Sequence, residues 1–182
     1  MNHLAHEGLL ACIIGGHFGP IQKLQELILR NQVEAYNFPI GVISHMLRDM
    51  AANRPTVTRI GLGTYVDPEQ EGGRLNACSK ENFVEKVVLD GEHYLHYRHL
   101  KKPTFAILRG SFADTKGNIS CEEESCYAES LQVAQTVHRN GGKVFVQVKA
   151  VVEHGSLDAR RIRIPGTIVD YVIPVSDLQY HK

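Results

Sequence analysis

The sequence predicts an α/β fold with an open, mainly parallel sheet, flanking helices and a peripheral β-hairpin. Short apolar runs alternate with helix-like patterns in the first third of the chain. A glycine cluster stands at the end of each of these runs, where an open α/β sheet carries its ligand. Asp90-Gly91 lies between two strand-like segments and is a strong signal for a two-residue hairpin.

The first part of the chain is predicted to run strand, helix, strand, helix, strand. Residues 9–14 suit a buried strand, and Pro20 suits the first turn of the helix that follows, because its missing N–H costs nothing there. Residues 33–36 and 57–60 are the next two strands. Apolar residues at helical spacing mark the two helices, Ile21, Leu24, Leu27 and Ile28 in the first and Val42, Ile43, Met46, Leu47 and Met50 in the second.

This order of elements predicts parallel pairing with right-handed crossovers. We therefore expect loops 15–19, 38–41 and 61–64 to lie together at the carboxyl edge of one sheet. Glycines in such turns let backbone N–H groups approach an anion or a polarised carbonyl, but they also serve as plain tight turns. Asn37 has two equally favoured interpretations: it hydrogen-bonds a ligand, or it caps the helix that starts near Gly41.

The second half of the chain adds a hairpin and further strands. Asp90-Gly91 joins predicted strands 83–89 and 92–97, and a helix is expected over 122–139, ending at Asn140-Gly141. Apolar segments suited to buried strands lie at residues 104–108, 144–148 and 168–173.

The composition favours a soluble, cytoplasmic protein with a single domain over residues 1–182. Its apolar content of 43% supports a sizeable core, and Lys plus Arg balance Asp plus Glu at 20 each, so nucleic acid is not an expected partner. No apolar stretch approaches the ~20 residues that span a bilayer, and no signal peptide is recognisable. No metal site is predicted. His93, His96 and His99 are three residues apart, and in a strand this spacing places successive side chains on opposite faces, where they cannot share one ion.

Taken together, several segments closely resemble the family I coenzyme A transferases, and among them the bacterial short-chain acyl-CoA transferases of the acetate and propionate type. The matching stretches are Gly-His-Phe-Gly at 16–19, Glu-Ala-Tyr-Asn-Phe-Pro at 34–39, Gly-Val-Ile-Ser-His at 41–45, the segment 61–68, Glu-Gly-Gly-Arg-Leu-Asn at 71–76, Ala-Asp-Thr-Lys-Gly-Asn-Ile at 113–119, and the segments 157–166 and 169–172. The likeness follows the order of the chain over nearly its whole length, so it is more specific than any single glycine motif.

The resemblance implies an enzyme of short-chain fatty acid or ketone body metabolism that moves coenzyme A from an acyl-CoA to a carboxylic acid. A glutamate of such enzymes attacks the thioester, and fixed donors stabilise the oxyanion that forms. No cofactor is expected, since the coenzyme A thioester is itself a substrate. The residues expected to bind substrate are Gly16, His17, Phe18, Gly19, Asn37, Ile40, Gly41, Gly63, Thr64, Gly72 and Gly73.

The chain departs from the family pattern at two points. The family's glutamate lies in its second half, so we expect no catalytic residue within 1–182. The chain is expected to be an N-terminal, α-type domain that lacks an opening segment and the catalytic C-terminal domain. Its expected partner is a second transferase domain or subunit, in a homo- or hetero-oligomer. The family usually has Gln where this chain has Ile40, which leaves an alternative: an inactive ligand-binding or interaction domain derived from a transferase half.

Overall fold

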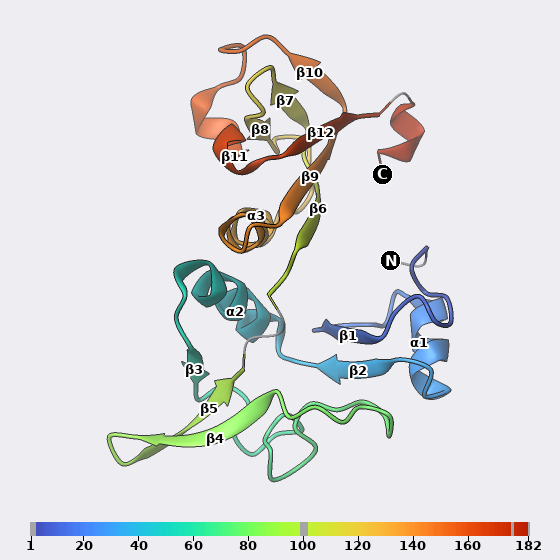
Figure 1. Cartoon of the computed structure of the whole chain (residues 1–182), viewed down its shortest axis with the longest axis vertical. Helices are drawn as coiled ribbons and strands as arrows, with labels where there is room; N and C mark the ends of the chain where they lie inside the picture. The colour runs from blue at the N-terminus through green and yellow to red at the C-terminus, as the bar shows by residue number, and fades with distance from the viewer. Residues whose placement is uncertain (1–2, 99–101, 176, 182) are drawn as a thin grey trace. The chain divides into compact units, whose positions relative to one another are not determined.

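The computed structural model describes residues 3–98, 102–175 and 177–181. Its backbone contacts divide the chain into two compact units, whose elements are labelled in Figure 1. The first unit holds the described residues of 1–49 and 54–100, and the second holds those of 50–53 and 101–182. A single transferase domain over 1–182 therefore stays a prediction. His99 lies outside the described residues.

The first unit opens with the predicted alternation of strands and helices. Strands β1 (Cys12–Gly15) and β2 (Glu34–Asn37) pair in parallel, with α1 (Gln22–Leu29) between them in the chain and α2 (Ile40–Ala52) after them. The parallel pair and its connecting helix confirm this part of the α/β prediction. One core cluster packs α1 against the strands through Leu24, Leu27 and Ile28, together with Ile13, Val33 and Ala35.

The third predicted strand does not join this parallel pair. β3 (Thr56–Thr58) pairs antiparallel with β5 (Glu92–Tyr97), which also pairs antiparallel with β4 (Val84–Leu89). The expectation of one parallel sheet through residues 57–60 is therefore wrong, because the hairpin leaves an edge of β5 open and β3 takes it. The hairpin itself is confirmed, with Asp90 and Gly91 at φ of 51° and 80° as a tight turn requires.

An aromatic core joins the two sheets of the first unit. Tyr36, Phe38 and Tyr97 are fully buried, and the Phe38 and Tyr97 rings meet edge to face with centroids 5.5 Å apart. Val42 and Met46 of α2, Val66, Val84 and Leu95 complete the cluster. Burial of three aromatic side chains dominates the local packing energy and holds the segment after β2 in place.

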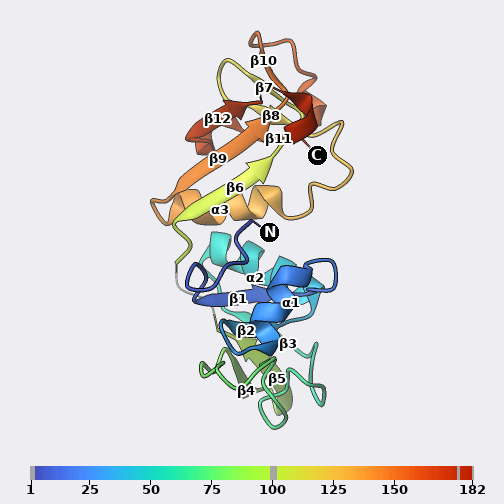
Figure 2. The same cartoon turned by 90° about the vertical axis from the view of Figure 1, so that its right-hand side faces the viewer.

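The second unit contains two sheets. The first has the parallel order β12-β9-β6, formed by β6 (Phe105–Arg109), β9 (Lys143–Val148) and β12 (Tyr171–Pro174), with α3 (Ser130–Arg139) packed along β6 and β9 (Figure 2). The second sheet has the order β10-β7-β8-β11. Its strands are β7 (Phe112–Asp114), β8 (Ile119–Ser120), β10 (Ala150–Val152) and β11 (Ile162–Ile164), and short 3-10 turns cover Ala159–Arg161, Gly166–Ile168 and Leu178–Tyr180.

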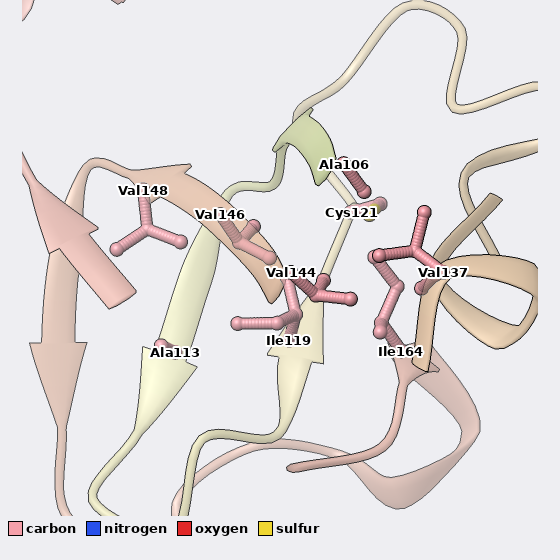
Figure 3. Packing of buried hydrophobic residues seen from close by; sticks show 10 residues of the cluster. Ala106, Ala113, Ile119, Cys121, Val137, Val144, Val146, Val148 and Ile164 are labelled. Carbon is pink, nitrogen blue, oxygen red and sulfur yellow. The ribbon is translucent and has the colours of Figure 1, made fainter. Parts of the chain in front are cut away.

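Both sheets of the second unit contribute to one hydrophobic core. Figure 3 shows Ala113 of β7, Ile119 of β8, Val144 of β9 and Val137 of α3 in this cluster. Each of these side chains is at most 1% exposed, so the space between the elements is closely filled. Among the described residues, no helix is long and apolar enough to cross a membrane.

The helix predicted over 122–139 begins later, at Ser130. The preceding acidic residues are held in a turn instead: the Glu123 N–H donates to Ser111 Oγ at 2.8 Å, and the Arg109 Nε–H donates to the Glu124 carboxylate at 2.7 Å. Lys149 also pairs with Glu123. These long-range partners compete with helix formation, and local charge near a helix start could not reveal them.

Candidate functional site

The carboxyl ends of β1 and β2 lie side by side. Gly15 and Asn37, the last residues of the two strands, are partners in the register. The Phe38 N–H donates to the Gly15 carbonyl oxygen at 3.1 Å, and the Asn37 Nδ2 donates to the same oxygen at 3.2 Å. Loops 15–19 and 38–41 therefore lie at one edge of a parallel sheet, as predicted.

Gly16 lets these two loops approach closely. A Cβ atom at Gly16 would lie 2.1 Å from Ile40 Cγ1 and 3.2 Å from Ile40 Cα, so a larger residue would require the Ile40 side chain to move and the start of α2 to shift slightly. Ile40 is the first residue of α2 and is 62% exposed. Gly41 follows in the first helical turn, whose N–H groups have no partner within the helix.

The rest of the first loop is anchored by α1. Gln25 Nε2 donates to the carbonyl oxygens of Phe18 and Gly19, at 3.0 and 2.8 Å. Phe18 packs against the core cluster around α1, whereas His17 is exposed. Of the residues predicted in this loop, His17 thus has the more accessible side chain, and Phe18 has a structural role.

The third loop, residues 61–76, is organised by Asp67. This carboxylate is 2% exposed and accepts bonds from the Gly63 N–H at 2.8 Å and the Glu69 N–H at 3.1 Å. The Gly63 N–H bond is the main reason that the pKa of Asp67 lies below its usual value, and Lys86, 3.5 Å away, acts in the same direction. Thr64 is exposed, and its hydroxyl donates to the Gly61 carbonyl oxygen at 2.8 Å.

Asn37 connects the third loop to the strand edge. Its backbone N–H donates to the Gly73 carbonyl oxygen at 2.8 Å, and its side-chain oxygen accepts a bond from the Tyr65 hydroxyl. With Nδ2 bonded to Gly15, both ends of the amide hold loops together, so the capping interpretation of Asn37 is wrong. An amide nitrogen carries two N–H groups, so Asn37 can still donate one bond to a ligand.

Gly72 and Gly73 form the inner part of the third loop. Both are buried, and their N–H groups donate to the carbonyl oxygens of Asp67 and Tyr65, at 3.1 and 3.0 Å. Gly73 has a φ of 77°, and a Cβ there would lie 2.8 Å from Phe38 Cε1 and 3.0 Å from the Asn37 carbonyl oxygen. Close packing explains Gly73, and a positive φ of 63° explains Gly72. Contact of either glycine with substrate stays a prediction.

Sequence reasoning did not assign a role to several residues that hold this site together. Tyr65 supplies the hydroxyl that binds Asn37, and burial raises the pKa of this phenol. Asn76 Nδ2 donates to the carbonyl oxygens of Ile28 and Val33, at 2.9 Å each, and the Ser79 hydroxyl accepts the Ala35 N–H at 2.8 Å. Polar residues in and after a long glycine-marked loop were the available signal, but their partners lie 28 to 48 positions away in the sequence.

A cavity of about 360 Å³ opens on the side of the third loop that faces β4. Its lining includes Gly72, Arg74, Lys86 and Arg98. Each cation is already engaged: Lys86 Nζ lies 2.8 Å from Glu69, Arg98 lies 3.4 Å from Glu85, and Arg74 donates to Asn82. Lys86 and Arg98 are thus paired with carboxylates, whereas Arg74 donates to a neutral amide oxygen.

The described residues offer a set of hydrogen-bond donors in the loops at the edge of β1 and β2. Within ranges 3–98, 102–175 and 177–181, no group of three or more His, Cys, Asp or Glu side chains is placed to hold a metal ion. Exposed residues at the edge of β1 and β2 include His17, Ile40 and Gly41. Such an edge can orient a carbonyl or a carboxylate through backbone N–H groups.

Comparison with known proteins assigns this arrangement to a family. The family model described as Coenzyme A transferase matches residues 6–174. The chain is 40% identical over 171 residues to "Acetate CoA-transferase YdiF" of Escherichia coli K12, covering 93% of this chain and 32% of the relative. It is 39% identical over 178 residues to "Caffeate CoA-transferase" of Acetobacterium woodii, covering 97% of this chain and 34% of the relative.

Solved structures agree. A YdiF structure from E. coli O157:H7, a thioester complex with CoA, superposes with a TM-score of 0.92 at 39% identity, covering 97% of this chain and 36% of that one. Glutaconate coenzyme A-transferase of Acidaminococcus fermentans superposes with a TM-score of 0.73 at 13% identity, over 92% of this chain and 56% of that one, which shows a shared fold. The chain spans about a third of the length of the curated relatives that it matches.

Proposed function

This chain belongs to the coenzyme A transferase family, and on that premise we propose that it forms part of an enzyme that moves coenzyme A from a short-chain acyl-CoA to a carboxylic acid. One observation carries the proposal: Asn37 hydrogen-bonds both Gly15 and Tyr65, and so joins loops 15–19, 37–41 and 61–76. All three loops lie inside the stretch that the family model matches. Relatives at 40% and 39% identity are named acetate and caffeate CoA-transferases, which supports a carboxylic acid as acceptor.

In this proposal the three loops shape the pocket for the acyl and carboxylate groups. The backbone N–H groups of Ile40 and Gly41, in the first turn of α2, carry a partial positive charge and are available to a carbonyl or carboxylate oxygen. Those of Val42 and Ile43 donate to the Pro39 carbonyl oxygen at 2.9 and 3.1 Å. Gly16 allows the first loop to lie against Ile40, so apolar surface and N–H donors adjoin. His17 and Asn37 add donors at the rim of the same edge.

The nucleophile belongs to the part of the transferase outside this stretch. Its glutamate carboxylate attacks the thioester carbonyl carbon, and the C–S bond breaks to give a mixed anhydride and the coenzyme A thiolate. The thiolate then attacks the glutamyl carbonyl, which releases the donor's carboxylate and leaves a glutamyl-CoA thioester. The acceptor acid reverses both steps, so no other reagent is consumed. The N–H donors of this chain would stabilise the oxyanion of these steps.

A second candidate is an inactive ligand-binding or interaction domain derived from a transferase half. Ile40 favours it, because this exposed side chain has no hydrogen-bond donor at a position where the family usually has Gln. The two candidates make opposite predictions for turnover but the same prediction for folding and ligand binding.

A chimeric enzyme separates the two candidates. Residues 6–174 would replace the stretch of E. coli YdiF that they match, and unmodified YdiF would be the control. The first proposal predicts acyl-CoA exchange and a glutamyl-CoA thioester that borohydride traps on the YdiF portion, with no turnover by the chain alone. A folded chimera that binds acyl-CoA without exchanging it would support the inactive candidate instead.

A further inference from the structure

One face of the parallel sheet in the second unit is covered by α3 and the opposite face is apolar and exposed. Ala106 of β6 and Val144 and Val146 of β9 are at most 2% exposed on the α3 side. On the opposite side, Phe105 is 65% exposed and Ile107 is 83% exposed. Strand residues alternate between faces, so this contrast defines two distinct surfaces of one sheet.

The apolar side chains of this face form a continuous strip across the three strands, in which Phe145 is half-buried between exposed neighbours. Ile107, Phe145 and Tyr171 are direct partners in the register of β6, β9 and β12. The Phe145 and Tyr171 rings stack with centroids 4.7 Å apart and an interplanar angle of 11°, and Phe105 lies 6.1 Å from Phe145. We call this surface the aromatic strip: Phe105, Ile107, Phe145, Tyr171 and Ile173.

Paired charges bound the aromatic strip at both ends of the strands. Lys143, opposite Phe105 in the register, pairs with Asp170 at 2.7 Å. Arg109, at the far end of β6, pairs with Glu124 at 2.7 Å. An apolar centre with a polar rim is the anatomy of a protein interface, and monomeric proteins seldom leave such a patch in water.

We propose that the aromatic strip binds an amphipathic α-helix contributed by the transferase polypeptide outside this stretch. Parallel sheets occur almost only with both faces covered by helices, and among the described residues α3 covers one face. The curated relatives are about three times as long as their match to this chain, so they carry further polypeptide that can supply the helix. The inference rests on the proposed function, because it assigns a surface to the rest of the enzyme.

A thiol on the aromatic strip tests the proposal. Ile107→Cys would be made in a background in which the exposed Cys12 and Cys126 are serine, both in the chain alone and in the YdiF chimera. Val88→Cys is the matched control, since Val88 is a 59% exposed strand residue of the first unit. In the chain alone, both introduced thiols should react with dithionitrobenzoate at similar rates. In the chimera, the Ile107→Cys thiol should react at least ~10-fold more slowly, because it reacts only when the helix opens.

Cross-linking identifies the occupant. A benzophenone attached to the Ile107→Cys thiol in the chimera should label YdiF residues spaced by three, four and seven positions, the pattern of a helix face. Equal reactivity of this thiol in chain and chimera would overturn the proposal. Protection of the thiol in the chain alone that increases with protein concentration would also overturn the proposal, because it indicates a second copy of this chain. Labelling at every second residue would overturn it as well, because it indicates a strand.

The chimera also keeps the two proposals apart. Coenzyme A exchange with a fully reactive Ile107→Cys thiol would contradict the helix proposal and leave the proposed function standing. A protected thiol without exchange would contradict the proposed function and leave the covered face standing.

Discussion

Replacing Gly73 with alanine should strongly destabilise the first unit. At a φ of 77° an alanine adopts the left-handed region, which costs ~1–2 kcal/mol. The new Cβ would also lie 2.8 Å from Phe38 Cε1 and 3.0 Å from the Asn37 carbonyl oxygen. Neither neighbour can move easily, because Phe38 is 0% exposed and the Asn37 oxygen is backbone. Such overpacking adds ~1–3 kcal/mol, so the total is ~2–5 kcal/mol.

Gly91→Ala separates the two contributions to this cost. Gly91 has a φ of 80°, but no atom lies within 4 Å of a Cβ placed there, so its substitution should cost only the backbone part of ~1–2 kcal/mol. Urea unfolding followed by far-UV circular dichroism suits a chain with no Trp. The Gly73→Ala midpoint should fall below that of Gly91→Ala by ~0.5–1.5 M. Equal midpoints would refute the close packing of the third loop against Phe38.

Three further outcomes follow from the same structure. In the YdiF chimera, Ile40→Gln should raise kcat, since one oxyanion donor is typically worth ~10²–10³ in rate; an unchanged kcat with normal folding would mean that other groups hold the oxyanion. The Asn118 side chain, aided by His154, lowers the pKa of Asp114, so the stability from this carboxylate is complete above its unfolded pKa of ~3.9 and is lost as pH falls below that value. The stability of the second unit at acid pH should thus depend less on pH in the Asp114→Asn variant than in the unmodified chain. Identical unfolding profiles of the two proteins would show that Asp114 does not contribute this pH-dependent stability. Burial raises the pKa of Tyr36 and Tyr97 to about 12, so ultraviolet titration should find these two tyrosines still protonated at about pH 11. Ionisation of both near pH 10 would contradict their burial.

The candidate site was partly predictable, because the conformation of a glycine turn depends on residues that are close to it in the sequence. Loops 15–19 and 38–41 lie at one sheet edge as expected, since a parallel βαβ unit constrains where its strand ends lie. The role of Asn37 was not predictable. Its amide could cap a helix, bind a ligand or join loops, and only the positions of Gly15 and Tyr65 decide among these.

The α/β class, the alternation of β1, α1, β2 and α2, and the hairpin at Asp90-Gly91 could all be predicted from the sequence, because periodicity and turn chemistry are local properties. Tertiary structure alone decided that β3 pairs antiparallel with β5, and that Glu123 and Glu124 turn toward Lys149 and Arg109 instead of starting a helix. A short strand can pair with any open edge at similar cost. Its partner therefore depends on which edge the folded core leaves free, and no local pattern of residues records that choice.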